Sequence, residues 1–294
     1  MEKNSNKVIV NMACGLANRM FQYAYYIYLK QKGYNVFVDY FNTAIWAHED
    51  VAWNRIFPNA IYRQASEMDV KRLGGGHDWF SKVRRKFLTF TTDVIEMKTA
   101  FDVSLPAPNG NSYMLGVFQS AAVVEAVADE IERLYEFPEF EDKRNRDLQQ
   151  LLLRQNSVGI HVRKAKDYQN TIWYQNTCDV TYYKRAVERI KSLVENPVFY
   201  VFTDNPQWVR DNFSWLDYKL VEGNPGAGWG NHCDMQLMSL CKHNIISNST
   251  YSWWGAFLNR NEGKIVICPD IWFNPKATED FSSQKLLAQN WIAL

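Results

Sequence analysis

The sequence predicts an α/β protein made of two Rossmann-like domains that face each other across a cleft. A strand, a tight turn, a long helix and a second strand follow one another before Tyr40, and the second half of the chain repeats this alternation. The length of 294 residues suits two medium domains, each with its own core. We therefore expect a first domain over residues 1–155 and a second over residues 156–294.

The first alternation predicts a βαβ unit. Apolar strands at 8–12 and 35–39 flank an amphipathic helix over 18–32, and Gly33 can end that helix with a left-handed cap. Because such strands are joined by a crossover helix, we expect them to pair in parallel.

The turn before this helix is a candidate ligand site. The backbone of Gly15 and the polar side chains of Asn18, Arg19 and Gln22 lie at the helix start, where amides can bind an anion. A simple close-packing turn is the alternative interpretation.

The remainder of the first half is less regular. Residues 40–112 show little periodicity, apart from glycine-rich loops and a basic run at 82–87 that fits a solvated helix face. A strand over 113–118 and helices over 121–135 and 142–154 follow, so we place the domain boundary near residue 155.

The second half alternates strands and helices throughout. Strands are expected at 157–162, 198–203, 218–221, 244–247 and 264–268, with helices at 182–194, 206–212, 235–242 and 253–259.

Composition excludes several classes of function. Lys plus Arg is 33 against 32 acidic residues, so the net charge of +1 offers no electrostatic footprint for nucleic acid. Five cysteines without CxxC spacing fit a reducing compartment, and they form no metal-ligand pattern. The start, MEKNSNKVIV, resembles neither a signal peptide nor a transmembrane segment. We expect a cytoplasmic protein, with a peripheral place at the inner membrane face left open.

Charged residues follow the strand at 157–162. Arg163 and Lys164 could hold a phosphate ester, and Asp167 supplies a carboxylate beside them. Ligands of open α/β sheets bind beyond the carboxyl ends of strands, so these residues are site candidates. A strand that runs into a solvated charged loop is the alternative.

Two other strand ends carry polar groups. Asp204 follows the strand at 198–203 at an expected switch point, although it could instead cap the next helix. Ser249, Thr250 and Ser252 immediately precede the helix expected at 253–259, where hydroxyls and amides could cradle a diphosphate; ordinary capping is the alternative.

Asp234 is a candidate for reading a nucleobase. A carboxylate can accept hydrogen bonds from both the ring N–H and the exocyclic amine of guanine. An acidic helix cap is an equally good interpretation of this residue.

Four motifs together resemble the bacterial-type α-1,2-fucosyltransferases of glycosyltransferase family 11. They are GLANRMFQYA at 15–24, HVRK at 161–164, FTD at 202–204 and DMQLMSLCKHNIISNSTYSWWGAFLN at 234–259. The resemblance implies a GT-B fold, GDP-fucose as donor, a galactose-containing glycan acceptor that a lipid could carry, inversion at the anomeric carbon, and neither metal nor cofactor. The chain contains no Asp-x-Asp sequence to hold a cation on a diphosphate.

The match has departures. The family's HxRRGDY reads here with Lys164 for the second Arg, Ala165 for Gly and one residue inserted before Asp167. In the first motif, Cys14 and Ala17 stand at positions where the family commonly has glycine. A lysine keeps the charge of an arginine but loses its bidentate fork.

The resemblance implies a single displacement in which a galactose 2-hydroxyl attacks the fucose anomeric carbon. We expect Arg163 to stabilise the departing diphosphate, and Asp167 either to accept the hydroxyl proton or only to orient the acceptor. His161 could hold the loop or donate to the phosphate. The acceptor would lie on the first domain and GDP-fucose on the second. A transferase for another GDP-sugar or linkage, and a non-catalytic sugar-binding protein, are the alternatives.

Overall fold

The computed structural model describes residues 6–40, 52–73, 79, 83, 94–96, 108, 110–165, 170–175, 177–276 and 283–294. The chain divides into two compact units, Met1–Glu136 and Phe137–Leu294. The boundary that we predicted near Gln155 therefore moves toward the amino terminus. The reason is that helix α7 (Lys143–Arg154) packs on helix α11 (Cys233–Leu240) and so belongs to the second unit.

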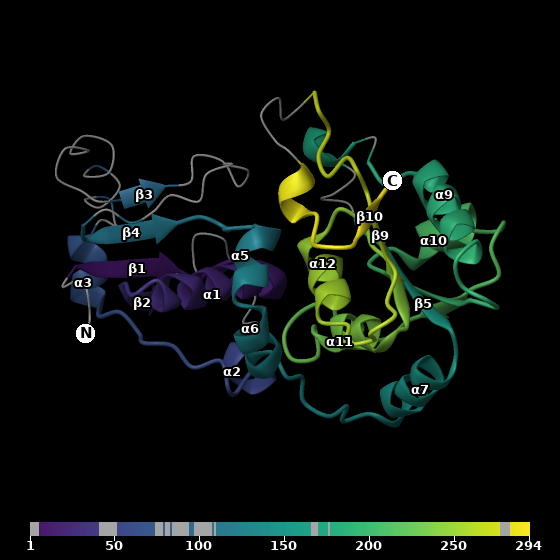
Figure 1. The fold of residues 1–294 in the computed structure, drawn as a ribbon, viewed down its shortest axis with the longest axis horizontal. Coiled ribbons are helices and arrows are strands. Elements are labelled where there is room, and N and C mark those ends of the chain that lie inside the picture. Colours follow the sequence, from purple (N-terminus) through teal and green to yellow (C-terminus); the bar gives the residue numbers. More distant parts are fainter. Residues whose placement is uncertain are drawn as a thin grey trace. The chain divides into compact units, whose positions relative to one another are not determined.

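The first unit contains a parallel sheet whose strands run in the order β2-β1-β4-β3 (Figure 1). The bounds of these strands are β1 Lys7–Asn11, β2 Asn35–Asp39, β3 Val94–Glu96 and β4 Ser112–Leu115. Strand β1 pairs in parallel with β2 and with β4, which confirms the predicted βαβ unit. Helix α1 (Leu16–Gln31) joins β1 to β2, and Gly33 follows it with a φ of +85°, as its predicted capping role requires.

Short helices complete the first unit. They are α2 Trp53–Ile56, α3 Glu67–Arg72, α5 Ala121–Ala126 and α6 Ala128–Leu134. The single helix predicted over 121–135 is thus two helices, because Val127 leaves helical geometry at φ −124° and ψ 18°.

The second unit contains a parallel sheet in the order β10-β9-β8-β5-β6-β7. Its strands are β5 Ser157–Val162, β6 Val198–Thr203, β7 Lys219–Val221, β8 His243–Ile245, β9 Val266–Cys268 and β10 Ile292–Ala293. Read from β7 and counted in chain order, this is the 3-2-1-4-5-6 order of a doubly wound Rossmann sheet. The order of strands reverses between β5 and β8, so the ligand crevice is expected there and not at β6, where we had placed it.

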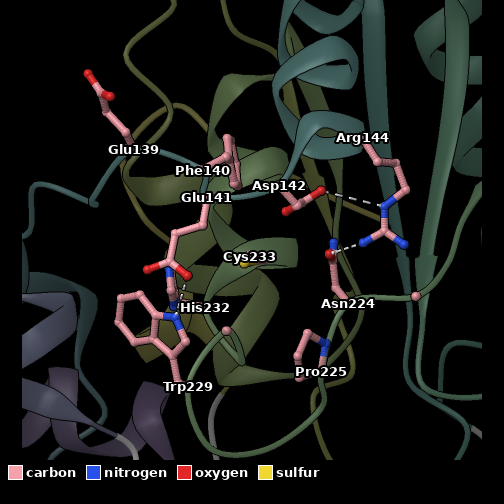
Figure 2. Close-up of a pocket in the computed structure, with 12 residues that line it drawn as sticks. Glu139, Phe140, Glu141, Asp142, Arg144, Asn224, Pro225, Trp229, His232 and Cys233 are labelled. Carbon is pink, nitrogen blue, oxygen red and sulfur yellow. Dashed lines mark hydrogen bonds and ion pairs between the residues drawn. The ribbon is translucent and has the colours of Figure 1, made fainter.

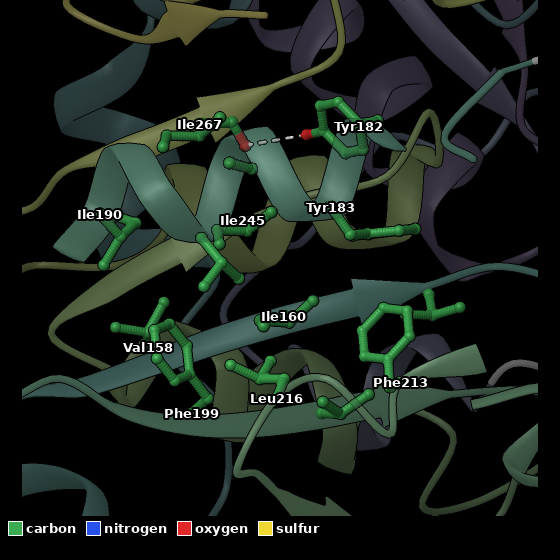
Figure 3. Packing of buried hydrophobic residues seen from close by; sticks show 14 of the residues in the cluster. Val158, Ile160, Tyr182, Tyr183, Ile190, Phe199, Phe213, Leu216, Ile245 and Ile267 are labelled. Atoms are coloured by element: carbon green, nitrogen blue, oxygen red, sulfur yellow. Dashed lines mark hydrogen bonds between the residues drawn. The ribbon is translucent and has the colours of Figure 1, made fainter. Parts of the chain in front are cut away.

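Helices flank this sheet and enclose its core. Besides α7 and α11 they are α9 Val180–Lys191, α10 Pro206–Asn212, α12 Thr250–Phe257 and the 3-10 turns η2 Ile172–Tyr174 and η3 Ser283–Leu286. Figure 3 shows Tyr182, Tyr183 and Ile190 of α9 over Val158 and Ile160 of β5. These β5 residues alternate with Gly159 and His161, which therefore point to the opposite face of the sheet.

The fold class is confirmed as α/β with two Rossmann-like units. That the two units face each other across a cleft stays a prediction.

Candidate active site

His161 and Ser247 join the carboxyl ends of β5 and β8 at the switch point. His161 Nδ1 lies 2.8 Å from Ser247 Oγ, and the His161 ring lies 5.9 Å from the Tyr251 ring. The carbonyl oxygen of His161 accepts a hydrogen bond from Tyr183 Oη at 3.0 Å. Burial, helped by the charge of Arg163, lowers the pKa of His161 to about 3. The imidazole is therefore neutral at pH 7, and its hydrogen bond with Ser247 links the ends of β5 and β8.

Asp204, at the end of β6, holds both residues that follow β5. Its Oδ2 forms an ion pair with Arg163 Nη1, and its Oδ1 accepts from the Lys164 backbone N–H at 2.7 Å. Asn205 Nδ2 donates to the Lys164 carbonyl at 2.9 Å. The loop that carries the two cations is thus fixed by a neighbouring strand, and the solvated-loop alternative does not describe it.

The side chain of Lys164 is half-buried over an aromatic ring. Its Nζ lies 5.2 Å from the centre of the Trp208 ring and 3.4 Å from the Thr177 carbonyl oxygen. Burial lowers the pKa of Lys164 from its usual value. The ammonium is therefore less well hydrated than a surface lysine, which strengthens its attraction for an anion.

The capping alternative holds for Asn205 but not for Asp204. Asn205 Oδ1 accepts from Trp208 N at 3.0 Å at the start of α10, with Pro206 in the first turn. Both oxygens of Asp204 are engaged by Arg163 and Lys164. Asp204 therefore orients the phosphate-binding candidates rather than presenting a free carboxylate.

The turn after β8 separates its hydroxyls into two groups. Ser249 is the N-cap residue of α12 and makes no side-chain capping bond, and Ser249 and Thr250 are both half-buried. Ser252 is fully buried and donates to the carbonyl oxygens of Ser247 at 3.3 Å and Ser249 at 3.1 Å. Contrary to our expectation, Ser252 stabilises the turn internally, so a diphosphate cradle here would consist of Ser249, Thr250 and the first amides of α12.

Asp234 lies in the first turn of α11, next to Cys233, which lines a cavity. The N-cap position belongs to His232, so the capping alternative for Asp234 fails. Asp234 Oδ1 accepts from Asn224 Nδ2 at 2.7 Å, and burial raises the pKa of this carboxyl. The cavity has a volume of about 450 Å³ and is lined by residues of segments 139–144 and 223–233, among them Asn224, Trp229 and Cys233 (Figure 2).

In the first unit, the structure changes the predicted role of Gln22. This side chain is buried, its Oε1 accepts from Ala13 N at 2.9 Å, and its Nε2 donates to the Gly116 carbonyl at 2.8 Å. Both ends of the amide tie α1 to the ends of strands β1 and β4, so Gln22 has a structural role within the buried interior of the unit. Arg19 is equally buried and donates to the Cys14 carbonyl.

Gly15 and Asn18 remain compatible with a ligand. Gly15 is the N-cap residue of α1, and the space where a Cβ would stand is open. Asn18 is half-buried, and its Oδ1 accepts from Gln119 Nε2 at 3.0 Å.

Asp167 lies outside the described residues, as do Lys166 and Tyr168. Its role as base or orienting group stays a prediction.

Sequence reasoning missed several polar residues that shape the site. Asn248 is buried, and its Nδ2 donates to Thr177 Oγ1 at 2.9 Å and to the Trp272 carbonyl at 2.7 Å, which ties the loop after β5 to the turn after β8. Asn224, the partner of Asp234, was also missed. The serine-rich run pointed to the neighbourhood of Asn248, but no local pattern marked Thr177 or Asn224.

A family model described as Glycosyl transferase family 11 matches residues 1–294. The chain belongs to this family. The expected resemblance is thereby confirmed over the whole sequence, including residues 40–112, where our motifs gave little support.

Curated relatives are similar in sequence to parts of the chain. The O-antigen biosynthesis glycosyltransferase WbnK of Escherichia coli is 32% identical over 191 residues, which are 63% of this chain and 61% of that protein. An alpha-1,2-colitosyltransferase of Escherichia coli is 30% identical over 51% of each chain. A galactoside alpha-(1,2)-fucosyltransferase 2 of Mus musculus is 29% identical over 34% of this chain and 30% of that protein. The match thus spans between half and two thirds of the two bacterial relatives.

Among solved structures, the fucosyltransferase NodZ from Bradyrhizobium shares the fold. The TM-score is 0.51, with 14% identity over 86% of this chain and 93% of that one. In the part of the chain that the structure describes, no helix is long and apolar enough to cross a membrane. No cluster of three His, Cys, Asp or Glu side chains in that part could hold a metal ion.

Proposed function

We propose that this family 11 member transfers L-fucose from GDP-fucose to the 2-hydroxyl of a β-galactoside in a glycan, with inversion and without a metal or other cofactor. The observation that carries the proposal is the position of Arg163. Asp204 holds its guanidinium at the β5 end of the switch point, where the turn after β8 begins helix α12.

The diphosphate would lie between Arg163 and the start of α12. A guanidinium has five N–H donors, so Arg163 can remain paired with Asp204 and still donate to phosphate oxygens. The partly desolvated Lys164 ammonium adds charge, and Ser249, Thr250 and the α12 amides add donors. All these groups are in place before the bond breaks, which is how preorganised donors stabilise a leaving group as its charge grows.

The guanine would lie against Asp234. A carboxylate offers two acceptors, which match the ring N–H and the exocyclic amine of guanine. Uracil lacks this pair of neighbouring donors, so the arrangement favours GDP over UDP.

The acceptor would bind on the first unit, and its 2-hydroxyl would attack the anomeric carbon from the face opposite GDP. The hydroxyl proton would pass to Asp167 if that residue is the base, and Asp167 would only orient the acceptor otherwise. We place the reaction in the cytoplasm, and at the inner membrane face if the galactoside is lipid-linked.

The competing candidate is a transferase for another GDP-sugar. The similarity to a colitosyltransferase supports this candidate, because the groups assigned above contact the nucleotide and not the sugar. A non-catalytic sugar-binding protein would have no use for Arg163 fixed by Asp204.

Incubation of the protein with GDP-fucose or GDP-colitose and a panel of β-galactosides tests the proposal. We expect a fucosylated product whose linkage, determined by NMR, is α-1,2. Transfer only from GDP-colitose would show that GDP-fucose is not the donor. A product with another linkage would show that the 2-hydroxyl is not the group that accepts the sugar. No turnover, together with no thermal stabilisation by GDP, would favour the sugar-binding alternative.

A further inference from the structure

The amide of Asn224 lies between an arginine and the carboxylate of Asp234. Its Nδ2 donates to Asp234 Oδ1 at 2.7 Å, and its Oδ1 accepts from Arg144 Nη2 at 2.6 Å and from Asn145 Nδ2 at 2.7 Å. Both ends of the amide are used, so its orientation is fixed. A carboxylate at this place would repel Asp234, and an aliphatic side chain would leave three polar partners without their hydrogen bonds.

The residues behind Asn224 are themselves held in place. Arg144 Nη1 donates to the Glu222 carbonyl at 2.7 Å, and the buried Asn145 donates through Nδ2 to Asp142 Oδ2 at 2.8 Å. Gly223 has a φ of +87°, and a Cβ there would collide with Arg144 Nη1. The loop after β7 is thus shaped to admit the arginine, and the network joins the start of α7 to the first turn of α11. Figure 2 shows the part of this network between Arg144 and Asn224.

We propose that Asn224 and Arg144 are positioning residues that orient the carboxylate of Asp234 toward the guanine of the donor. The inference rests on the proposed function, in which Asp234 reads guanine. Within the described part of the chain no hydrogen bond reaches Asp234 Oδ2, and Oδ1 retains a second lone pair. The carboxylate can therefore accept both guanine donors while Asn224 holds it.

The network also favours the ionised form that this recognition requires. Burial raises the pKa of Asp234, while the hydrogen bond from Asn224 and the charge of Arg144 act in the opposite direction. A protonated carboxyl would present a donor to the guanine donors. Removal of Asn224 would therefore disturb both the direction and the charge of the acceptor pair.

The exocyclic amine of guanine provides a specific measurement. Inosine diphosphate lacks this amine but keeps the ring N–H, the ribose and the diphosphate, so the ratio of the dissociation constants of IDP and GDP reports one contact. A hydrogen bond to a charged group is worth about tenfold or more in affinity, so we expect GDP to bind the unaltered protein at least about tenfold more tightly than IDP.

The experiment measures both dissociation constants by calorimetry on the full chain and its variants. We expect Asn224→Ala to reduce the IDP-to-GDP ratio to about 1–2, and Arg144→Lys, which keeps the charge but loses the fork, to reduce it in part. Arg210→Ala is the matched control, because it removes only the ion pair between Arg210 and Glu222 at the same loop and should leave the ratio unchanged. Far-UV circular dichroism checks that each variant is folded. If Asn224→Ala does not fold, the ratio measured for Arg144→Lys tests the positioning role.

The outcomes distinguish the positioning role of Asn224 from the reading of guanine by Asp234. An unchanged ratio in folded Asn224→Ala, or in Arg144→Lys when only that variant folds, overturns the positioning role. Equal binding of GDP and IDP to the unaltered protein, or an unchanged ratio in Asp234→Asn, would show that Asp234 does not read guanine and that Asn224 and Arg144 have no positioning role for it. Failure to bind GDP at all contradicts the proposed function itself.

Discussion

At the scale of single residues, Arg163 has the most direct link to chemistry. Replacement by alanine removes a preorganised donor from the leaving diphosphate, so we expect turnover to fall by roughly 10²-fold. Arg163→Lys should recover only part of this loss, since it restores charge without the bidentate fork. Steady-state kcat with GDP-fucose and a productive galactoside measures the effect. Arg210→Ala, at an exposed arginine that is likewise paired with a carboxylate, is the control, and near-normal turnover of Arg163→Ala would contradict the assignment.

Cys14 has a backbone conformation that favours glycine. Its φ of +71° lies in the left-handed region, which costs a residue with a Cβ about 1 kcal/mol. We expect Cys14→Gly to stabilise the chain by about 0.5 kcal/mol or more, and Cys14→Ala, which keeps the Cβ, to give no gain. Urea denaturation measures both variants. Equal effects of glycine and alanine would show that the thiol, and not the backbone, decides stability here.

At the scale of secondary-structure elements, Gly159 controls how closely strand β5 approaches its neighbours. A Cβ at this position would lie 3.0 Å from Cys241 Sγ and 3.2 Å from Asn244 Nδ2. We therefore expect Gly159→Ala to reduce the free energy of unfolding by about 1–3 kcal/mol through overpacking.

The double variant Gly159→Ala, Cys241→Ala tests the cause of that loss. Removal of the sulfur frees the nearer contact, so the double variant should be more stable than the sum of the two single effects predicts. Strict additivity in urea denaturation would show that the strain arises elsewhere.

Element by element, the sequence predicted best the segments that have an apolar run or a marked helix start. The bounds of β2, β6 and α10 agree with the structure, because apolar periodicity and a proline at the helix start mark them. Strands β3 and β10 were missed, since β3 lies in the region 40–112 that shows little periodicity and β10 has only two residues. They become strands only by pairing with β4 and β9.

The candidate site was predictable to the same degree. Their positions at strand ends made Arg163, Lys164 and Ser249 candidates, because parallel strands deliver their carboxyl ends to one edge of the sheet. The use of each group could not be inferred, since it depends on partners distant in the chain. The amide of Gln22, for example, forms hydrogen bonds with the backbone of Ala13 and Gly116. Asp204 was a candidate for binding substrate because it follows a strand end, but its carboxylate forms an ion pair with Arg163 instead.

At the scale of the whole molecule, a buried neutral histidine links stability to pH. The pKa of His161 is about 3 in the folded chain and about 6.5 when unfolded, so the unfolded state binds more protons between these values. Stability from this group is complete above pH 6.5 and is lost as pH falls toward 3. Between pH 7 and pH 5 the loss should be about 2 kcal/mol.

His161→Asn removes this titration while an amide can still bond Ser247 Oγ. We expect the variant to be less stable than the unaltered chain at pH 7, because the packing of the ring is lost, yet to lose about 2 kcal/mol less on going to pH 5. Urea denaturation at both pH values gives the change in the free energy of unfolding with pH for the variant and for the unaltered chain. Equal changes in the two proteins would mean that His161 becomes charged without destabilising the folded chain. The contact between β5 and β8 would then tolerate an imidazolium.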